Sequence, residues 1–191
     1  TVATDGTAGV YSFGYSVDYK AGRALVGAPG ADPAGKSNAG AAYAFLRPAG
    51  TGVAAWTADG LMSRGIANDA MGQSVALSNT VDGALVGARF ATSPAPESIA
   101  NAGAAYVFDR NATVKWGFTD DFGVDPTISL GAAPAKAGDN FGWSVGVTGN
   151  IAIVGGMARI ATVIQRERAA SQRVLHLDSG DIFQGAPVFN T

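Results

Sequence analysis

Hydrophobic and polar positions alternate over short stretches through the first 150 residues of the chain. Runs rich in apolar residues, such as 16–19 and 24–26, extend over only a few residues and are separated by glycine-containing connections. No segment in this part keeps a 3.6-residue period for long, which argues against helical repeats. The pattern therefore predicts many short β-strands joined by tight turns.

The same short blocks occur again along the chain, and their order never changes. A first block occurs three times, a second block follows each copy at a short distance, and a third block occurs twice. The first block is at 13–17, 71–75 and 141–145, the second at 24–29, 84–89 and 152–157, and the third at 38–45 and 101–108. Ordered repetition of this kind predicts one structural unit that is used several times.

Each unit has the composition of a small antiparallel sheet. The first two blocks are β-prone runs joined at 20–23 by a hairpin connection, and Gly83 and Gly149 lie at the equivalent turns, where glycine supplies a positive φ. Residues 104–108 predict a third strand, and 113–118 a fourth. Four short strands with glycine-rich turns are typical of one blade of a β-propeller. We therefore expect a mainly β fold.

The blocks resemble the FG-GAP repeat family. Phe13 and Gly14, with Gly-Ala-Pro at 27–29, carry both defining elements, and the resemblance extends over about 8–155. It implies a seven-bladed, integrin-like propeller on a secreted or periplasmic protein, used for adhesion or ligand binding. Two complete repeats and part of a third cannot close such a ring. We therefore expect a partial propeller of two to three blades within 1–154, whose open sheet edges allow self-association.

The pattern changes from Met157 onward. Apolar residues then recur with helical spacing, at Met157, Ile160, Ala161 and Ile164, which predicts an amphipathic helix of about 14 residues. Residues 174–178 predict a strand. Residues 155–191 are therefore expected to be a short α/β fragment, which could take 151–154 as its first strand, although the third repeat includes the same stretch.

This C-terminal fragment resembles the metallophosphatase domain of the 5′-nucleotidase family, through 155–162, 166–168 and 177–185. The resemblance implies that Asp181 bridges two divalent ions of the zinc, manganese or cobalt type. The family's other ligands are missing, because the only histidine is His176, which lies between two leucines and is expected to be structural. The fragment is therefore expected to be inactive without further segments.

Composition excludes several other functions. The net charge is −2 and the 13 basic residues are scattered, which argues against nucleic-acid binding. The sequence contains no cysteine, so disulfides, thiolate zinc sites and cysteine nucleophiles are excluded. No apolar run approaches the roughly 20 residues that a membrane helix needs.

Two further candidate sites have plain structural alternatives. Many FG-GAP proteins carry a calcium loop between the first two strands, but 20–23 has no acidic alternation. Asp121 and Asp125, beside Asp120, form the densest acidic cluster and a candidate calcium site, with a solvated turn as the alternative. The aromatic residues could line a carbohydrate-binding face, although we expect them to pack between blades. They are Trp56, Trp116, Trp143, Tyr43 and Tyr106.

The sequence predicts an extracellular or periplasmic interaction module that binds a protein or a glycan through loops on one propeller face. The alternative is a fragment of a secreted, metal-dependent 5′-nucleotidase or phosphoesterase.

Overall fold

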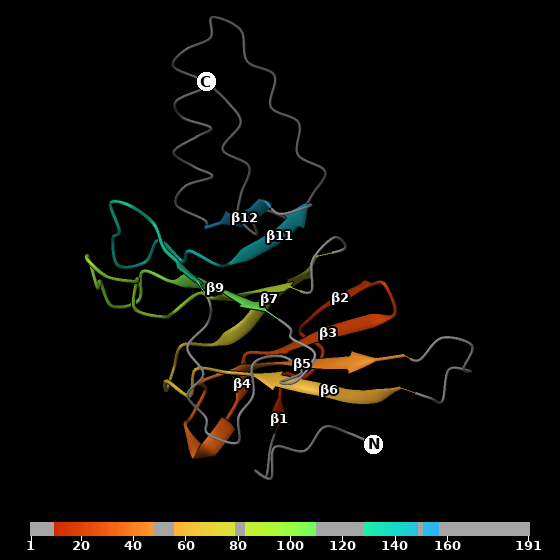
Figure 1. The fold of residues 1–191 in the computed structure, drawn as a ribbon. Helices are drawn as coiled ribbons and strands as arrows, with labels where there is room; N and C mark the ends of the chain where they lie inside the picture. The colour runs from red at the N-terminus through yellow and green to blue at the C-terminus, as the bar shows by residue number, and fades with distance from the viewer. Residues whose placement is uncertain (1–9, 48–55, 79–82, 110–127, 149–150, 157–191) are drawn as a thin grey trace, which may run out of the picture.

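The computed structural model describes residues 10–47, 56–78, 83–109, 128–148 and 151–156. Short antiparallel strands in these ranges form sheets that are stacked one above another, with the N-terminal sheet at the bottom of Figure 1 and the C-terminal one at the top. The predicted mainly β architecture, consistent with propeller blades, is confirmed. No helix among the described residues is long and apolar enough to cross a membrane.

The first sheet, which we call unit 1, has four strands in the order β2-β3-β5-β6. Its strands are β2 (Ser16–Lys20), β3 (Arg23–Ala28), β5 (Ala41–Leu46) and β6 (Thr57–Met62). Ala21 and Gly22 have φ angles of 52° and 78°, the signature of a two-residue type I′ hairpin turn. The hairpin predicted at 20–23 is therefore confirmed.

Two small elements lie beside unit 1. The strands β1 (Val10–Tyr11) and β4 (Gly30–Ala31) pair with each other. A short 3₁₀ helix, η1 (Pro33–Gly35), follows β4.

Unit 2 repeats the plan of unit 1, and unit 3 repeats its first half. Unit 2 has the order β7-β8-β9-β10, with β7 (Met71–Leu77), β8 (Gly83–Ala88), β9 (Ala104–Asp109) and β10 (Ile128–Leu130). In unit 3, β11 (Ser144–Thr148) pairs with β12 (Ile151–Gly155). The predicted third strand is thus confirmed as β9.

Some sequence predictions fall on other parts of the chain. The predicted fourth strand at 113–118 lies outside the described residues, and β10 takes the fourth place in unit 2. The predicted helix and strand of the fragment 155–191 also lie outside them. The stretch 151–154, which two folds could have used, belongs to β12 and pairs with β11.

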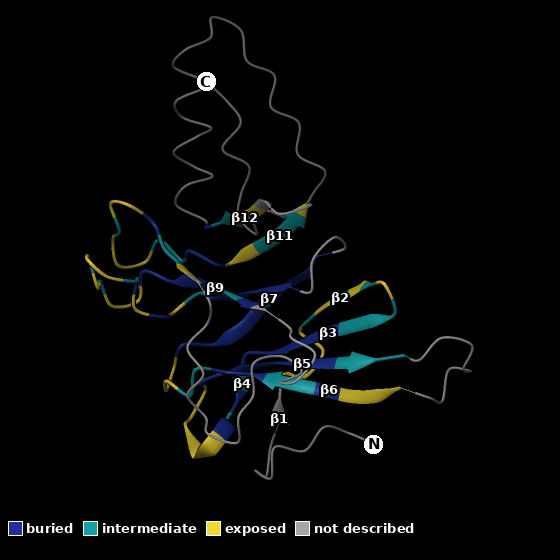
Figure 2. Cartoon of the chain, in the orientation of Figure 1, coloured by how far each residue is buried: buried dark blue, intermediate teal, exposed yellow. Residues whose placement is uncertain are grey.

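Each sheet has a first face and a second face, and equivalent residues lie on the same face in every unit. The first face carries Val17, Val26 and Tyr43 in unit 1, which are aligned across β2, β3 and β5. The second face carries the alternate residues, such as Leu25 and Ala44. In Figure 2 the strands of unit 2 lie in the middle of the stack and are mostly buried, whereas much of β2 is exposed.

The core lies between successive units, where the second face of one unit packs against the first face of the following unit. Leu25, Ala42, Ala44 and Met62 of unit 1 cluster with Met71, Val75, Leu77 and Val86 of unit 2. Ala76, Leu85 and Ala105 of unit 2 cluster in the same way with Phe141, Val145 and Val147 of unit 3. The hydrophobic effect therefore stabilises the stack at each repeat boundary rather than in one central core.

The Phe-Gly and Gly-Ala elements of neighbouring units meet at a backbone contact. A Cβ atom on Gly27 would lie 2.1 Å from the carbonyl oxygen of Gly72, and one on Gly87 would lie 2.0 Å from that of Gly142. At both places a serine hydroxyl donates to the same carbonyl oxygen at 2.9 Å, from Ser16 or from Ser74. The sheets can approach this closely only because the strand residue is glycine.

Candidate functional site

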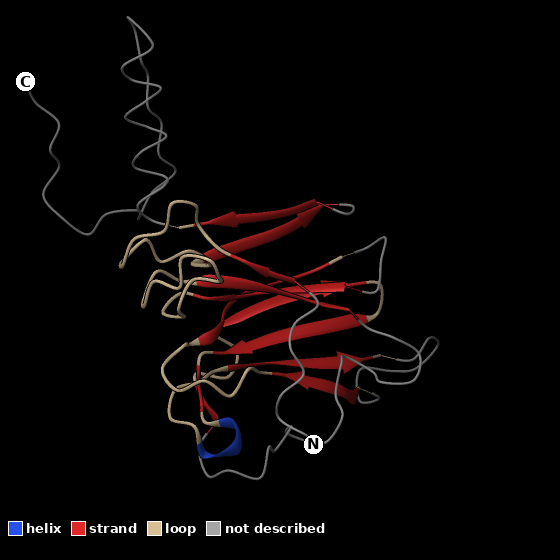
Figure 3. Ribbon diagram, turned by 60° about the vertical axis from the view of Figure 1, so that its left-hand side comes forward, coloured by secondary structure: helices blue, strands red, loops and turns tan. Residues whose placement is uncertain are grey.

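A pocket of about 600 Å³ opens among the loops of all three units. These loops gather along one side of the stack, the side at the left of Figure 3. The lining residues are Ser12, Tyr15, Pro29, Gly30, Asn38, Asn68, Ala70, Gln73, Arg89, Phe90, Asn101, Gly138 and Asn140. A pocket lined from every unit is the natural candidate for a binding site.

Four asparagines surround the pocket, and their backbone conformation helps to shape it. All of them have φ between 50° and 67°, namely Asn38, Asn68, Asn101 and Asn140. Asparagine tolerates this left-handed region better than most residues other than glycine. The carbonyl of Asn38 accepts from the N–H of Ala70 at 3.1 Å, and that of Asn101 from Gly138 at 2.8 Å. Backbone hydrogen bonds therefore join the loops of adjacent units around the pocket.

Among the described residues that line the pocket, Arg89 is the only one with a charged side chain. Its Cζ atom lies 4.3 Å from the centroid of the Phe90 ring and 4.7 Å from that of Trp143. Its Nε atom is buried and has no hydrogen-bond partner within the described part of the chain. Cation–π contacts thus orient the guanidinium while one N–H donor stays unused.

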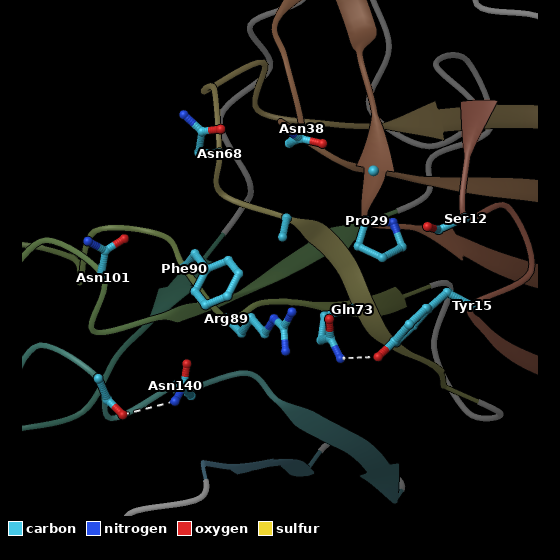
Figure 4. A pocket seen from close by; sticks show the side chains of 13 residues that line it. Ser12, Tyr15, Pro29, Asn38, Asn68, Gln73, Arg89, Phe90, Asn101 and Asn140 are labelled. Carbon is cyan, nitrogen blue, oxygen red and sulfur yellow. Dashed lines mark hydrogen bonds between the residues drawn. The ribbon is translucent and has the colours of Figure 1, made fainter. Parts of the chain in front are cut away.

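The pocket wall also contains a hydrogen bond between two units. The side-chain amide of Gln73 donates from Nε2 to the hydroxyl of Tyr15 at 3.1 Å. In Figure 4 this pair lies on one side of Arg89, while Phe90 and Asn101 lie on the other. The site therefore combines one cation with neutral amide and hydroxyl groups.

Asp69, which is buried, and Arg64, which is partly buried, lie near the loops that line the pocket. Burial raises the pKa of Asp69 to about 6, and the positive charge of Arg64 opposes this rise. Burial also raises the pKa of the Tyr106 hydroxyl, while a hydrogen bond from Arg64 Nη1 at 3.1 Å opposes it. The backbone N–H of Phe90 donates to the carbonyl of Asp69 at 3.3 Å. These groups connect the loop before β7 to the pocket wall.

The sequence-predicted metal ligands lie outside the described residues. They are Asp121, Asp125 and Asp181; His176, which is expected to be structural, lies outside the described residues as well. Within the described ranges, no three His, Cys, Asp or Glu side chains are grouped so that they could hold a metal ion. The two-metal and calcium sites therefore stay predictions.

The aromatic residues divide between packing and the pocket. Tyr43 and Tyr106 are buried. Tyr106 packs between units 1 and 2, as predicted, whereas Tyr43 clusters with residues of unit 1 alone. Trp56 is partly exposed, and its ring packs edge-on against Tyr19. Trp143 is also partly exposed, and Arg89 stacks on it beside the pocket.

Sequence reasoning did not identify Arg89 as a functional residue. A signal was available, because Arg89 and Phe90 occupy the positions at which unit 1 has Pro29 and Gly30. A repeat that departs from its own pattern at a loop position marks a place where packing alone does not determine the residue.

Residues 2–45 and 62–108 match the FG-GAP repeat. These ranges contain β2, β3, β7 and β8 and all but the last residue of β5 and β9, and they include the contact of Gly27 with Gly72 between units 1 and 2. Among curated proteins, none matches the sequence. Nothing in these comparisons supports the metallophosphatase resemblance of 155–191, which stays a prediction.

Proposed function

We propose that this chain is an extracellular or periplasmic interaction module that binds a carboxylate-bearing ligand at Arg89. Its FG-GAP repeats and propeller-type sheets support an interaction role. The observation that carries the ligand class is a single oriented cation among the neutral residues that line the pocket. The ligand is an acidic protein side chain or an acidic sugar, since both present the same group.

The geometry of Arg89 suits a carboxylate better than a neutral ligand. A guanidinium presents parallel N–H donors that match the two oxygens of a carboxylate. Stacking on Phe90 and Trp143 occupies the faces of the guanidinium and leaves its edge for hydrogen bonds. Because the orientation is already fixed, little side-chain entropy is lost on binding. Amide groups such as that of Asn101 can then contact neutral parts of the ligand.

The test uses small probes, because they isolate the carboxylate chemistry. The tripeptide Gly-Asp-Gly and glucuronic acid are titrated into the ¹⁵N-labelled chain, with Gly-Asn-Gly and glucose as uncharged counterparts. We expect both acids, but neither counterpart, to shift the Nε–H resonance of Arg89.

The matched variants are Arg89→Gln and Lys36→Gln, the second removing an exposed positive charge outside the pocket lining. Arg89→Gln should weaken the binding of the acids by about tenfold or more, because a charge-assisted pair is lost. Lys36→Gln should leave it unchanged. Equal affinity in both variants, or no response of Arg89 to either acid, would refute the proposal.

A further inference from the structure

The same contact between units occurs twice within the chain, between units 1 and 2 and between units 2 and 3. Each time it joins the same two kinds of sheet face. One side is the first face of the following unit, led by β7 or β11. The other side is the second face of the preceding unit, and β7 packs chiefly on β2 and β3 there. The contact therefore needs only the first two strands of the preceding unit.

The β2 part of the first face of unit 1 is one half of this contact without its partner, whereas Val26 and Tyr43 on β3 and β5 of the same face are buried. Tyr15, Val17 and Tyr19 are 55%, 62% and 54% exposed. Their equivalents in unit 2 are Gln73, Val75 and Leu77, which are 6%, 8% and 2% exposed. The φ angle of Gly14 is +89°, close to the +87° and +86° of its equivalents Gly72 and Gly142. Unlike these two, Gly14 has open space around its Cβ position.

The second face of unit 3 is the other half. Ile153 is 56% exposed, whereas its equivalents Leu25 and Leu85 are 0% and 1% exposed. Ser144 is exposed, although Ser16 and Ser74 at the same position each donate to a glycine carbonyl of the next unit. Unit 3 has both strands that the contact requires, β11 and β12.

We propose that the second face of unit 3 binds the first face of unit 1 in a second copy of this chain. The two open surfaces correspond to the two halves of one contact that the chain already makes twice, so each is complementary to the other surface on another copy. Ser144 would donate to the carbonyl of Gly14 in that copy, and Ile153 would pack among Val17 and its neighbours. This head-to-tail association uses different surfaces on the two partners. Val17 and Ile153, the residues at its centre, are outside the lining printed for the Arg89 pocket, so the association can be tested separately from the ligand.

The experiment is sedimentation velocity on the full chain, from micromolar to near-millimolar concentration. We expect the average mass of the wild-type chain to rise with concentration. Val17→Asp and Ile153→Asp each place a charge on one of the two surfaces. The association constant of each variant alone should be lower than that of the wild-type chain by about tenfold or more. Ile66→Asp, at an exposed position between the units, should behave like the wild-type chain.

The decisive arm mixes the two charged variants. Each retains the surface that the other lacks, so the mixture should form one-to-one dimers and nothing larger. Both residues are exposed, so both variants should fold, which circular dichroism checks, and Val17→Lys and Ile153→Lys replace any variant that does not. A wild-type chain that stays monomeric, a mixture without dimers, or undiminished association of either variant alone would overturn the proposal. The last result would instead indicate pairing through strand edges.

Discussion

Adding a single methyl group at Gly27 should weaken the boundary between units 1 and 2. The Cβ of Gly27→Ala would lie 2.1 Å from the carbonyl oxygen of Gly72 and 2.2 Å from Oγ of Ser16, whereas ordinary contact begins at 3.4 Å. The sheets would therefore have to separate by about 1.3 Å, which forfeits much of their dispersion contact. The serine would also lose its 2.9 Å hydrogen bond to Gly72.

These two effects set the expected magnitude. Overpacking a close contact costs about 1–3 kcal/mol, and a lost hydrogen bond costs about 0.5–1.5 kcal/mol. We therefore expect Gly27→Ala to lower the free energy of unfolding by about 2–4 kcal/mol, a large part of the usual total. Urea titration followed by circular dichroism measures this change.

Gly146→Ala is the matched control. Gly146 is also a strand glycine on a second face, but no atom lies within 4 Å of its Cβ position. The control should change the free energy of unfolding by less than about 0.5 kcal/mol, or raise it slightly by restricting the unfolded chain. Equal stability of the two variants at dilute protein concentration would refute the close-contact explanation.

Two further predictions concern the same boundaries. Gly87→Ala should lower the free energy of unfolding by as much as Gly27→Ala, because its Cβ would lie 2.0 Å from the carbonyl oxygen of Gly142. Urea titration again measures this change. Asp69 binds a proton more tightly in the folded chain, with its pKa raised from 3.8 to about 6, so its contribution to stability should fall as pH rises from about 4 to 6. Asp69→Asn should flatten this part of the stability profile, and an unchanged slope in this variant would contradict the assignment.

Much of the fold was predictable because its signals are local. Alternating apolar residues and turn glycines indicate strands and hairpins within a few residues, as at Ala21 and Gly22. The constant order of the blocks then predicts repeated sheets. The fourth strand of unit 2 shows the limit of this reasoning. The fourth place in unit 2 belongs to β10, which has only three residues and too short a pattern to recognise.

The contacts between units and the pocket depend on residues far apart in the sequence. Ser16 and Gly72 are 56 positions apart, and Ser74 and Gly142 are 68 apart. Their repeated types could be noticed, but the fact that they touch follows only from the stacking of the sheets. The role of Arg89 also depends on a distant residue, because its guanidinium lies over the ring of Trp143 in the next unit. Local pattern cannot show which aromatic ring a distant arginine will meet.

Amide hydrogen exchange at Leu77 tests the stacking of units most directly. Its N–H donates to Oδ2 of Asp18 at 2.7 Å, and its carbonyl accepts from Nζ of Lys20 at 2.6 Å, so unit 1 supplies both partners. Asp18→Ala should speed exchange at Leu77 by about tenfold or more relative to the amides of β8, since a hydrogen bond to a charged group is lost. Unchanged exchange at Leu77 would show that units 1 and 2 do not meet face to face.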